Sequence, residues 1–108
     1  MNPKEIWQTS LPYYDGHEQT GVRPVLILSA VEADTVIVIP FTSNKNALKY
    51  LSTLKINPSF ENGLDKESIA LIFQIRVIDV KRCIQKIGII EEEYYNDVLL
   101  MLKKKIDL

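Results

Sequence analysis

Two apolar segments that lie close together in the sequence place the strongest constraint on how this chain folds. Residues 24–29 read PVLILS and residues 35–41 read TVIVIPF, with apolar side chains at successive positions. Neighbouring side chains of a strand point to opposite faces, so both faces of these two strands must be covered. A short polar turn at residues 32–34 joins them. The sequence therefore predicts a β-hairpin with the core on one face and a helix or a partner subunit on the other.

The length and composition predict one domain over residues 1–108. The chain is 46% apolar and 25% charged, with a formal net charge of -1. Its longest apolar run, residues 36–41, is far shorter than the roughly 20 residues of a membrane helix. Residues 1–7 lack an apolar signal region, and a lone cysteine, Cys83, cannot build an internal disulfide framework. We therefore expect a cytoplasmic protein without a membrane partner.

The same composition narrows the chemistry. The chain has one His and one Cys, His17 and Cys83, whereas a structural zinc site needs four such ligands and a catalytic one usually three. No Asp-rich loop has the spacing of a calcium or magnesium site. We therefore expect no metal and no other cofactor. Because the net charge is close to zero, any binding of nucleic acid would have to come from a local basic patch.

The rest of the chain favours short strands and one terminal helix. Strands are expected at residues 4–10, 51–56, 68–77 and 83–87, with a long loop after the first, a helical turn at 79–82 and a stop at Gly88. Glutamates at 91–93 and lysines at 103–105 complement the dipole of a helix between them. The helix has an apolar face that docks on the sheet, formed by Tyr95, Val98, Leu99, Leu102 and Ile106. Together these elements predict a mainly β fold, a small curved, barrel-like sheet with a C-terminal amphipathic helix.

The segment from Gly16 to Pro24 carries an unusual density of polar functional groups. It reads GHEQTGVRP, so an acid, an imidazole, an amide and a guanidinium lie between two glycines or just beyond them. Glycines allow close backbone approach to a ligand, and loops on a rigid scaffold are where sites usually lie. The alternative is an ordinary solvated turn in which Arg23 pairs with Glu18.

Five motifs resemble, in order and spacing, one known family. They are EIW at residues 5–7, GHEQ at 16–19, GVRPVLILS at 21–29, PFTS at 40–43 and QIRVID at 74–79. Over nearly the whole chain this pattern is similar to the MazF/PemK toxins. The resemblance implies a homodimeric SH3-like barrel of the MazF/CcdB/Kid-like toxin fold. It also implies a metal-independent, sequence-specific endoribonuclease that cleaves single-stranded RNA and is neutralised by a cognate antitoxin protein.

The resemblance implies catalytic roles for Arg23 and Thr42, which match the family's catalytic arginine and threonine. RNA cleavage without a metal proceeds by attack of the 2'-hydroxyl on its own phosphate, giving 2',3'-cyclic phosphate and 5'-hydroxyl ends. The planar fork of Arg23 suits the charge of the phosphorane, and the Thr42 hydroxyl can donate to the same phosphate. The alternative for Thr42 is a turn hydroxyl that bonds its own backbone.

Proton transfer is assigned less directly. His17 is the candidate acid or base, because imidazole exchanges protons most readily near neutral pH, with a merely solvated loop histidine as the alternative. Family members that resemble the Kid toxin carry an Arg-x-Asp pair just before the Gln-x-Arg motif. This sequence departs from them, because the matching positions are Leu71 and Phe73, which can transfer no proton. The identity of the base stays open.

The expected contacts to RNA lie around this centre. The resemblance implies RNA-binding roles for Glu18, Gln19, Ser43, Gln74 and Arg76. Gln74 and Arg76 are expected on one face of a strand, with an Arg76–Asp79 salt bridge as the alternative for the arginine. Aromatic side chains stack unpaired bases and cations bind phosphates, which gives further candidates in Tyr13, Tyr14, Lys45 and Lys49.

Two other functions use the same fold. The first is a CcdB-like toxin that binds DNA gyrase, but residues 103–108, KKKIDL, lack the Trp-Gly-Ile ending of such chains. The second is a non-catalytic RNA-binding barrel, against which the presence of Arg23 and Thr42 speaks.

Overall fold

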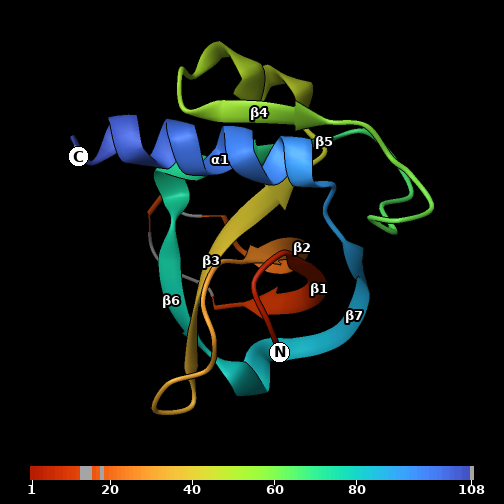
Figure 1. Cartoon of the computed structure of the whole chain (residues 1–108), viewed down its shortest axis with the longest axis vertical. Helices are drawn as coiled ribbons and strands as arrows, with labels where there is room; N and C mark the ends of the chain where they lie inside the picture. Colours follow the sequence, from red (N-terminus) through yellow and green to blue (C-terminus); the bar gives the residue numbers. More distant parts are fainter. Residues whose placement is uncertain (13–15, 18, 108) are drawn as a thin grey trace.

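The computed structural model describes residues 1–12, 16–17 and 19–107, whose arrangement Figure 1 shows. These residues form short strands, three 3-10 helices and one α-helix. In chain order the elements are β1 (Glu5–Leu11), β2 (Gly21–Ile27), β3 (Thr35–Thr42), η1 (Lys45–Lys49), β4 (Thr53–Ile56), β5 (Ser68–Leu71), η2 (Ile72–Gln74), β6 (Arg76–Asp79), η3 (Val80–Arg82), β7 (Cys83–Ile89) and α1 (Glu92–Lys105). The predicted mainly β fold with a C-terminal helix is confirmed.

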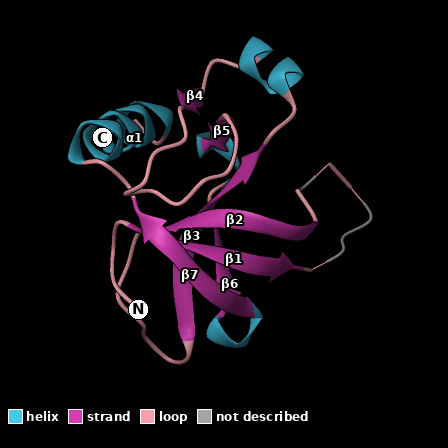
Figure 2. Ribbon diagram, turned by 90° about the vertical axis from the view of Figure 1, so that its right-hand side faces the viewer, coloured by secondary structure: helices cyan, strands magenta, loops and turns pink. Residues whose placement is uncertain are grey.

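Strand β3 pairs with three other strands, β2, β5 and β6. The strand order is β4-β5-β3-β2-β1-β7, and β6 also pairs with β3. Residues 35–38 of β3 pair with β6, whereas its last two residues, Phe41 and Thr42, pair with β5. The pairings are antiparallel, and Figure 2 shows the resulting curved sheet with α1 beside β4 at one end. Thr42 therefore ends the strand at which several parts of the sheet meet.

The predicted hairpin between β2 and β3 is confirmed. Glu32 and Thr35 exchange two backbone hydrogen bonds of 3.0 and 2.9 Å. Between them Ala33 and Asp34 have φ values of 51° and 60°. Two successive positive φ values give a turn whose twist matches that of the flanking strands.

Both faces of β2 and β3 are covered over most of their length, as their apolar pattern predicts. Alternate residues belong to two cores, with Leu26 in one and Val25 and Ile27 in the other. The first core includes Tyr95 and Val98 of α1. The second is closed by residues of β1 and β6 as the sheet curls over itself. Near the start of β3, Ile37 and its β6 partner Val77 stay 38% and 61% exposed, so this chain covers most but not all of the two faces.

The single strand expected at residues 68–77 is wrong. The chain leaves β5 at Leu71, makes the 3-10 turn η2 and resumes as β6 at Arg76. In the turn the Ile75 amide donates to the Ile72 carbonyl at 3.2 Å, and Ile72 is fully buried in the first core. The break lets β5 pair with the end of β3 and β6 with its start. Gln74 consequently lies on a turn and Arg76 on a strand.

The strand expected to stop at Gly88 continues to Ile89. A Cβ at Gly88 would overlap the backbone of Asn62, and the Ile89 amide donates to the Glu61 carbonyl at 2.8 Å. Gly88 thus allows the loop before β5 to lie against β7, rather than ending the strand. The strand expected at residues 51–56 starts later, at Thr53, and the side chain of Leu51 is 97% exposed.

The predicted helix is confirmed, but its docked face is narrower than expected. Tyr95 and Val98 are buried, whereas Leu99 and Ile106 are 41% and 54% exposed. Tyr94, Met101 and Leu102 complete the contact with the first core. Helix α1 lies along β4 and η2, so only a narrow stripe of it can reach the core. Of the residues that the structure describes, none belongs to a helix with the length and apolar character that crossing a membrane requires.

A nearly buried carboxylate joins β1 to β7. Glu5 accepts a hydrogen bond of 2.8 Å from Nε1 of Trp7 and lies 3.6 Å from Nζ of Lys86. Burial acts to raise the pKa of Glu5, but the hydrogen bonds from Trp7 and Asn2 and the positive charge of Lys86 outweigh it. The pKa of this carboxyl is therefore lowered.

Candidate active site

Two clefts in the described surface meet at Thr42. The first, which we call the Arg23 cleft, has a volume of about 480 Å³, and the second, the His17 cleft, about 460 Å³. The Arg23 cleft is lined by Gln8, Val22, Arg23, Pro24, Phe41, Thr42, Ser43, Gly63, Leu64, Asp65, Lys66, Ser68, Gln85 and Ile87. The His17 cleft is lined by His17, Gln19, Thr42, Asn44, Asn46, Ala47, Lys49, Tyr50, Leu71, Phe73 and Gln74. One nearly buried hydroxyl is thus shared by both.

Arg23 stands on β2 and is held by the segment that precedes the strand. Its Nε donates to the Thr20 carbonyl at 3.0 Å. The Gln19 amide faces the guanidinium, and with its oxygen turned that way it accepts from Nε at 2.6 Å and from both terminal nitrogens at 3.2 Å. These contacts fix a planar, permanently charged group at the wall of the cleft. Glu18, the alternative partner of Arg23, lies outside the described residues.

Thr42 is the last residue of β3 and is 7% exposed. Its Oγ1 accepts a hydrogen bond of 3.2 Å from the backbone amide of Asn44. The hydroxyl thus does bond its own turn, as the alternative interpretation expected. A hydroxyl also carries a proton of its own, so Thr42 can accept from this turn and still donate to a ligand in either cleft.

Gln74 ties the glycine-rich segment to η2. Its Oε1 accepts from the backbone N–H of Gln19 at 2.7 Å and from Nη2 of Arg76 at 3.3 Å, while its Nε2 donates to the backbone carbonyl of His17 at 3.3 Å. Both ends of the Gln74 amide are therefore engaged by the protein. Arg76 contacts this network from β6 and is not among the described residues that line the two clefts.

The His17 cleft combines an exposed imidazole with aromatic rings. The rings of Tyr50 and Phe73 lie with centroids 5.3 Å apart, and Nζ of Lys49 is 5.2 Å from the centre of the Tyr50 ring. Half of the Tyr50 side chain is exposed. This surface can stack an unpaired base beside a cation, which is the usual way in which single-stranded nucleic acid is held.

A family model matches residues 2–106 of this chain, and its description reads "PemK-like, MazF-like toxin of type II toxin-antitoxin system". The chain belongs to this PemK/MazF family. An endoribonuclease MazF of Staphylococcus saprophyticus is 30% identical over 102 residues, which cover 91% of this chain and 84% of that protein. The span of the family model includes all the residues that line the two clefts.

Solved structures agree with the family. MazF from Deinococcus radiodurans has a TM-score of 0.85 at 18% identity, covering 100% of this chain and 97% of that one. A mycobacterial endoribonuclease, solved in complex with its cognate antitoxin, has a TM-score of 0.77 at 15% identity, covering 100% and 96%. At such identities these likenesses show the fold, and they confirm that this PemK/MazF chain has the fold that its motifs predict.

The structure brings together most of the residues that the PemK/MazF resemblance singled out. Arg23, Thr42 and Ser43 line one cleft, and His17, Gln19 and Gln74 line the other. Tyr13 and Tyr14 lie outside the described residues, as Glu18 does. In this part of the PemK/MazF chain that the structure describes, no group of three or more His, Cys, Asp and Glu side chains is placed so that it could hold a metal ion.

Sequence reasoning missed several cleft residues. Gln8, Asp65, Lys66 and Gln85 line the Arg23 cleft, and Tyr50 lines the His17 cleft. Asp65, Lys66 and Gln85 lie far along the sequence from the PemK/MazF motifs that carry Arg23 and Thr42, and Gln8 and Tyr50 lie outside those motifs. The one available signal was the polar stretch DKES at residues 65–68 directly after a turn cluster.

Proposed function

We propose that this chain is the toxin component of a type II toxin-antitoxin system and a metal-independent, sequence-specific endoribonuclease of the cytoplasm. Its substrate is single-stranded RNA, cleaved to 2',3'-cyclic phosphate and 5'-hydroxyl ends. The observation that carries the proposal is the presence of Arg23 and Thr42 on the wall of one cavity. Membership of the PemK/MazF family and the likeness to an endoribonuclease MazF support it.

Arg23 supplies charge to the transition state. Attack of the 2'-oxygen on phosphorus gives a phosphorane that carries more negative charge than the phosphodiester, and a fixed guanidinium stabilises that charge more than the ground state. Its terminal nitrogens can bind two non-bridging oxygens at once. The contacts with Thr20 and Gln19 hold the guanidinium in place before the substrate arrives, so little reorganisation is needed.

Thr42 donates a hydrogen bond to the same phosphate. Because Oγ1 already accepts from the Asn44 amide, the orientation of the hydroxyl is restricted and its proton points away from the turn. Ser43, the next residue, is exposed in the Arg23 cleft and provides another hydroxyl for the RNA. Together these groups clamp the reacting phosphate at the junction of the two clefts.

His17 handles protons on the other side of the junction. In an in-line displacement the attacking 2'-oxygen loses a proton and the leaving 5'-oxygen gains one, at opposite sides of the phosphorus. An imidazole in the His17 cleft can serve one of these two oxygens while the phosphate is held at Thr42. Gln74 fixes the backbone carbonyl of His17 and therefore positions the loop that carries the imidazole.

The clefts also define the partners of the chain. The Tyr50 and Phe73 rings with Lys49 provide a surface for unpaired bases, while Arg23 binds the phosphate. Glu18, Gln19 and the Gln74–Arg76 pair complete the set of residues proposed to face or support the RNA. We further propose a homodimer and a cognate antitoxin that blocks the clefts. A solution mass of twice 12.4 kDa, and loss of cleavage on adding the antitoxin, would test both.

The decisive experiment incubates the purified protein with a long single-stranded RNA in EDTA and maps the fragment ends. We expect discrete cuts with cyclic phosphate and 5'-hydroxyl termini. Arg23→Ala should lower the cleavage rate by about a hundredfold or more. The variant should remain folded, as judged by its thermal melting profile. Uncut RNA with the wild-type protein across varied sequences would refute the nuclease and direct attention to RNA binding alone, or to gyrase inhibition. Undiminished cleavage by Arg23→Ala would refute the role of that residue.

A further inference from the structure

The loop before β5 brings a lysine to the Arg23 cleft that the motifs do not include. Gly63 has a φ of 70°, and a Cβ there would overlap the carbonyl of Ile87 in β7. Next to it, Leu64 is 6% exposed, and its amide donates to Oδ1 of Asn62 at 3.0 Å. The backbone that leads into Asp65 and Lys66 is therefore anchored against β7 and in the core.

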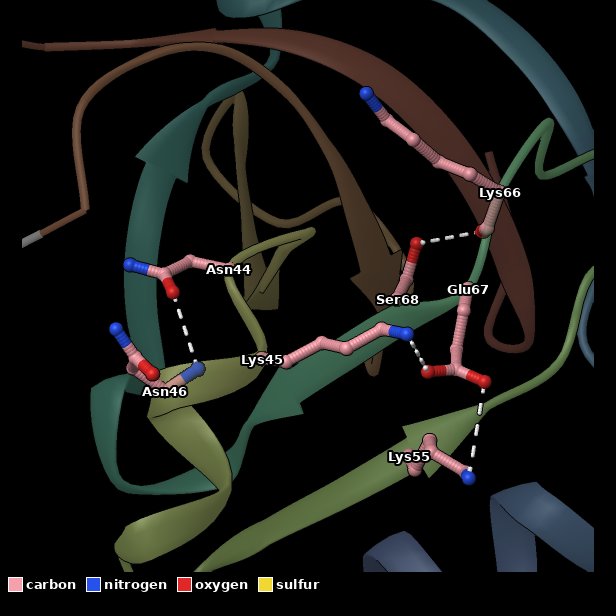
Figure 3. A network of polar contacts seen from close by, with 7 residues as sticks. All are labelled: Asn44, Lys45, Asn46, Lys55, Lys66, Glu67 and Ser68. Atoms are coloured by element: carbon pink, nitrogen blue, oxygen red, sulfur yellow. Dashed lines mark hydrogen bonds and ion pairs between the residues drawn. The ribbon is translucent and has the colours of Figure 1, made fainter.

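The other end of this loop is also fixed. Oγ of Ser68, the first residue of β5, donates to the carbonyl of Lys66 at 3.2 Å, as Figure 3 shows. Ser68 is 5% exposed. The main chain of Lys66 is thus held on both sides, and only its side chain is free to adapt to a ligand.

The lysines around this loop have different surroundings. Both oxygens of Glu67 are engaged, by Nζ of Lys45 at 3.3 Å and by Nζ of Lys55 at 3.7 Å. In Figure 3 the side chain of Lys66 extends away from Glu67, toward β1 and β2. Within the described part of the chain, Lys66 forms no ion pair with a carboxylate. Lys66 lines the Arg23 cleft, whereas Lys45 and Lys55 are paired with Glu67.

The charge of the Arg23 cleft favours an anion. Among the residues that line it, Arg23 and Lys66 are cationic and Asp65 is anionic, and the remaining polar groups are neutral amides and hydroxyls. Arg23 comes from β2, and Lys66 comes from the loop before β5. An extended polyanion that lies in this cleft would meet two cations supplied by two different segments.

We propose that Lys66 binds a backbone phosphate of the substrate next to the phosphate that Arg23 and Thr42 hold, and so sets the position of the strand in the cleft. The inference rests on the proposed function, because it takes single-stranded RNA as the ligand. Lys66 acts on a phosphate that does not react. Its contact is therefore the same in the ground state and in the transition state, and its loss raises KM without lowering kcat.

The test compares Lys66→Gln with Lys55→Gln, which removes the same charge from a lysine that pairs with Glu67 and does not line the cleft. Binding is measured by fluorescence anisotropy with single-stranded oligonucleotides that carry 2'-deoxyribose and cannot be cleaved, at several salt concentrations. We expect Lys66→Gln to weaken binding about five- to tenfold at low salt and to reduce the slope of log K against log salt by about 0.7. Lys55→Gln should leave this slope unchanged, and Lys66→Arg should restore binding.

Cleavage kinetics complete the test. Lys66→Gln should raise KM by a similar factor with kcat unchanged. Equal salt slopes for the two glutamine variants, or a fall in kcat at constant KM, would overturn the inference. A wild-type protein that cleaves no RNA but loses binding on Lys66→Gln would refute the nuclease proposal and support the role of Lys66. A protein that cleaves RNA but does not respond to Lys66→Gln would refute Lys66 alone.

Discussion

Replacing Thr42 by valine removes both of its roles at once, and the two losses have different readouts. Valine has the shape of threonine without the hydroxyl, so Thr42→Val removes the proposed donor to the phosphate together with the acceptor for the Asn44 amide. Loss of one donor to a transition state costs about 2.7–4 kcal/mol, which corresponds to a fall in kcat of about 10²–10³. Loss of the turn hydrogen bond costs about 1 kcal/mol of folding free energy.

These two magnitudes can be told apart. A domain with about 5 kcal/mol of stability that loses about 1 kcal/mol still has roughly one molecule in a thousand unfolded, which cannot lower the rate measurably. The melting temperature should fall by about 4–8 °C. Single-turnover cleavage of a defined RNA, with thermal melts of the same samples and Thr42→Ser as the control that keeps the hydroxyl, measures both effects. A loss of less than threefold in kcat for Thr42→Val would refute the reasoning.

Two further predictions concern stability. Because the pKa of Glu5 is lowered in the folded state, its contribution is complete above the pKa of the unfolded chain and is lost as the pH falls through the folded-state value. Urea unfolding at a series of acidic pH values should therefore show a smaller dependence on pH for Glu5→Gln than for the wild type, and identical profiles would contradict the assignment. Alanine at Gly63 would be strained by the positive φ of 70°, and its Cβ would also overlap the carbonyl of Ile87. Alanine at Gly21 would be strained by a φ of 84°, but its Cβ would lie in open space. Gly63→Ala should therefore lower the free energy of unfolding by clearly more than the roughly 1–2 kcal/mol expected for Gly21→Ala, and equal losses would show that the contact with β7 is unimportant.

The sequence was sufficient for features that depend on neighbouring side chains. The paired apolar runs predict the β2–β3 hairpin and its contact with a core on each face, and the glutamate and lysine clusters predict α1. Each of these signals is complete within a few turns or strand positions. The same pattern did not predict the break at η2. Continuous apolar residues fit one buried strand as well as two short ones, and only pairing with different parts of β3 decides between them.

The site shows the same limit. Arg23 and Thr42 could be named because they lie in recognisable motifs, whereas Lys66 and Gln85 line the cleft through contacts between the loop before β5 and β7. Helical periodicity likewise predicted that α1 has an apolar face, but not how many residues of that face are buried. Leu99 is exposed because the helix meets its neighbours along a narrow line, which is a property of the packed sheet and not of the helix.

The pairing of the first strand with the last has a consequence for synthesis on the ribosome. Glu5 of β1 is paired with Ile89 of β7. The sheet is therefore incomplete until β7, which is synthesised much later than β1, has paired with it. The Arg23 cleft includes Gln85 and Ile87 of that late strand. A nascent chain still lacking β7 therefore has the arginine and the threonine but no finished cleft around them. On the proposed function, a fragment that ends before β7 is therefore expected to cleave no RNA.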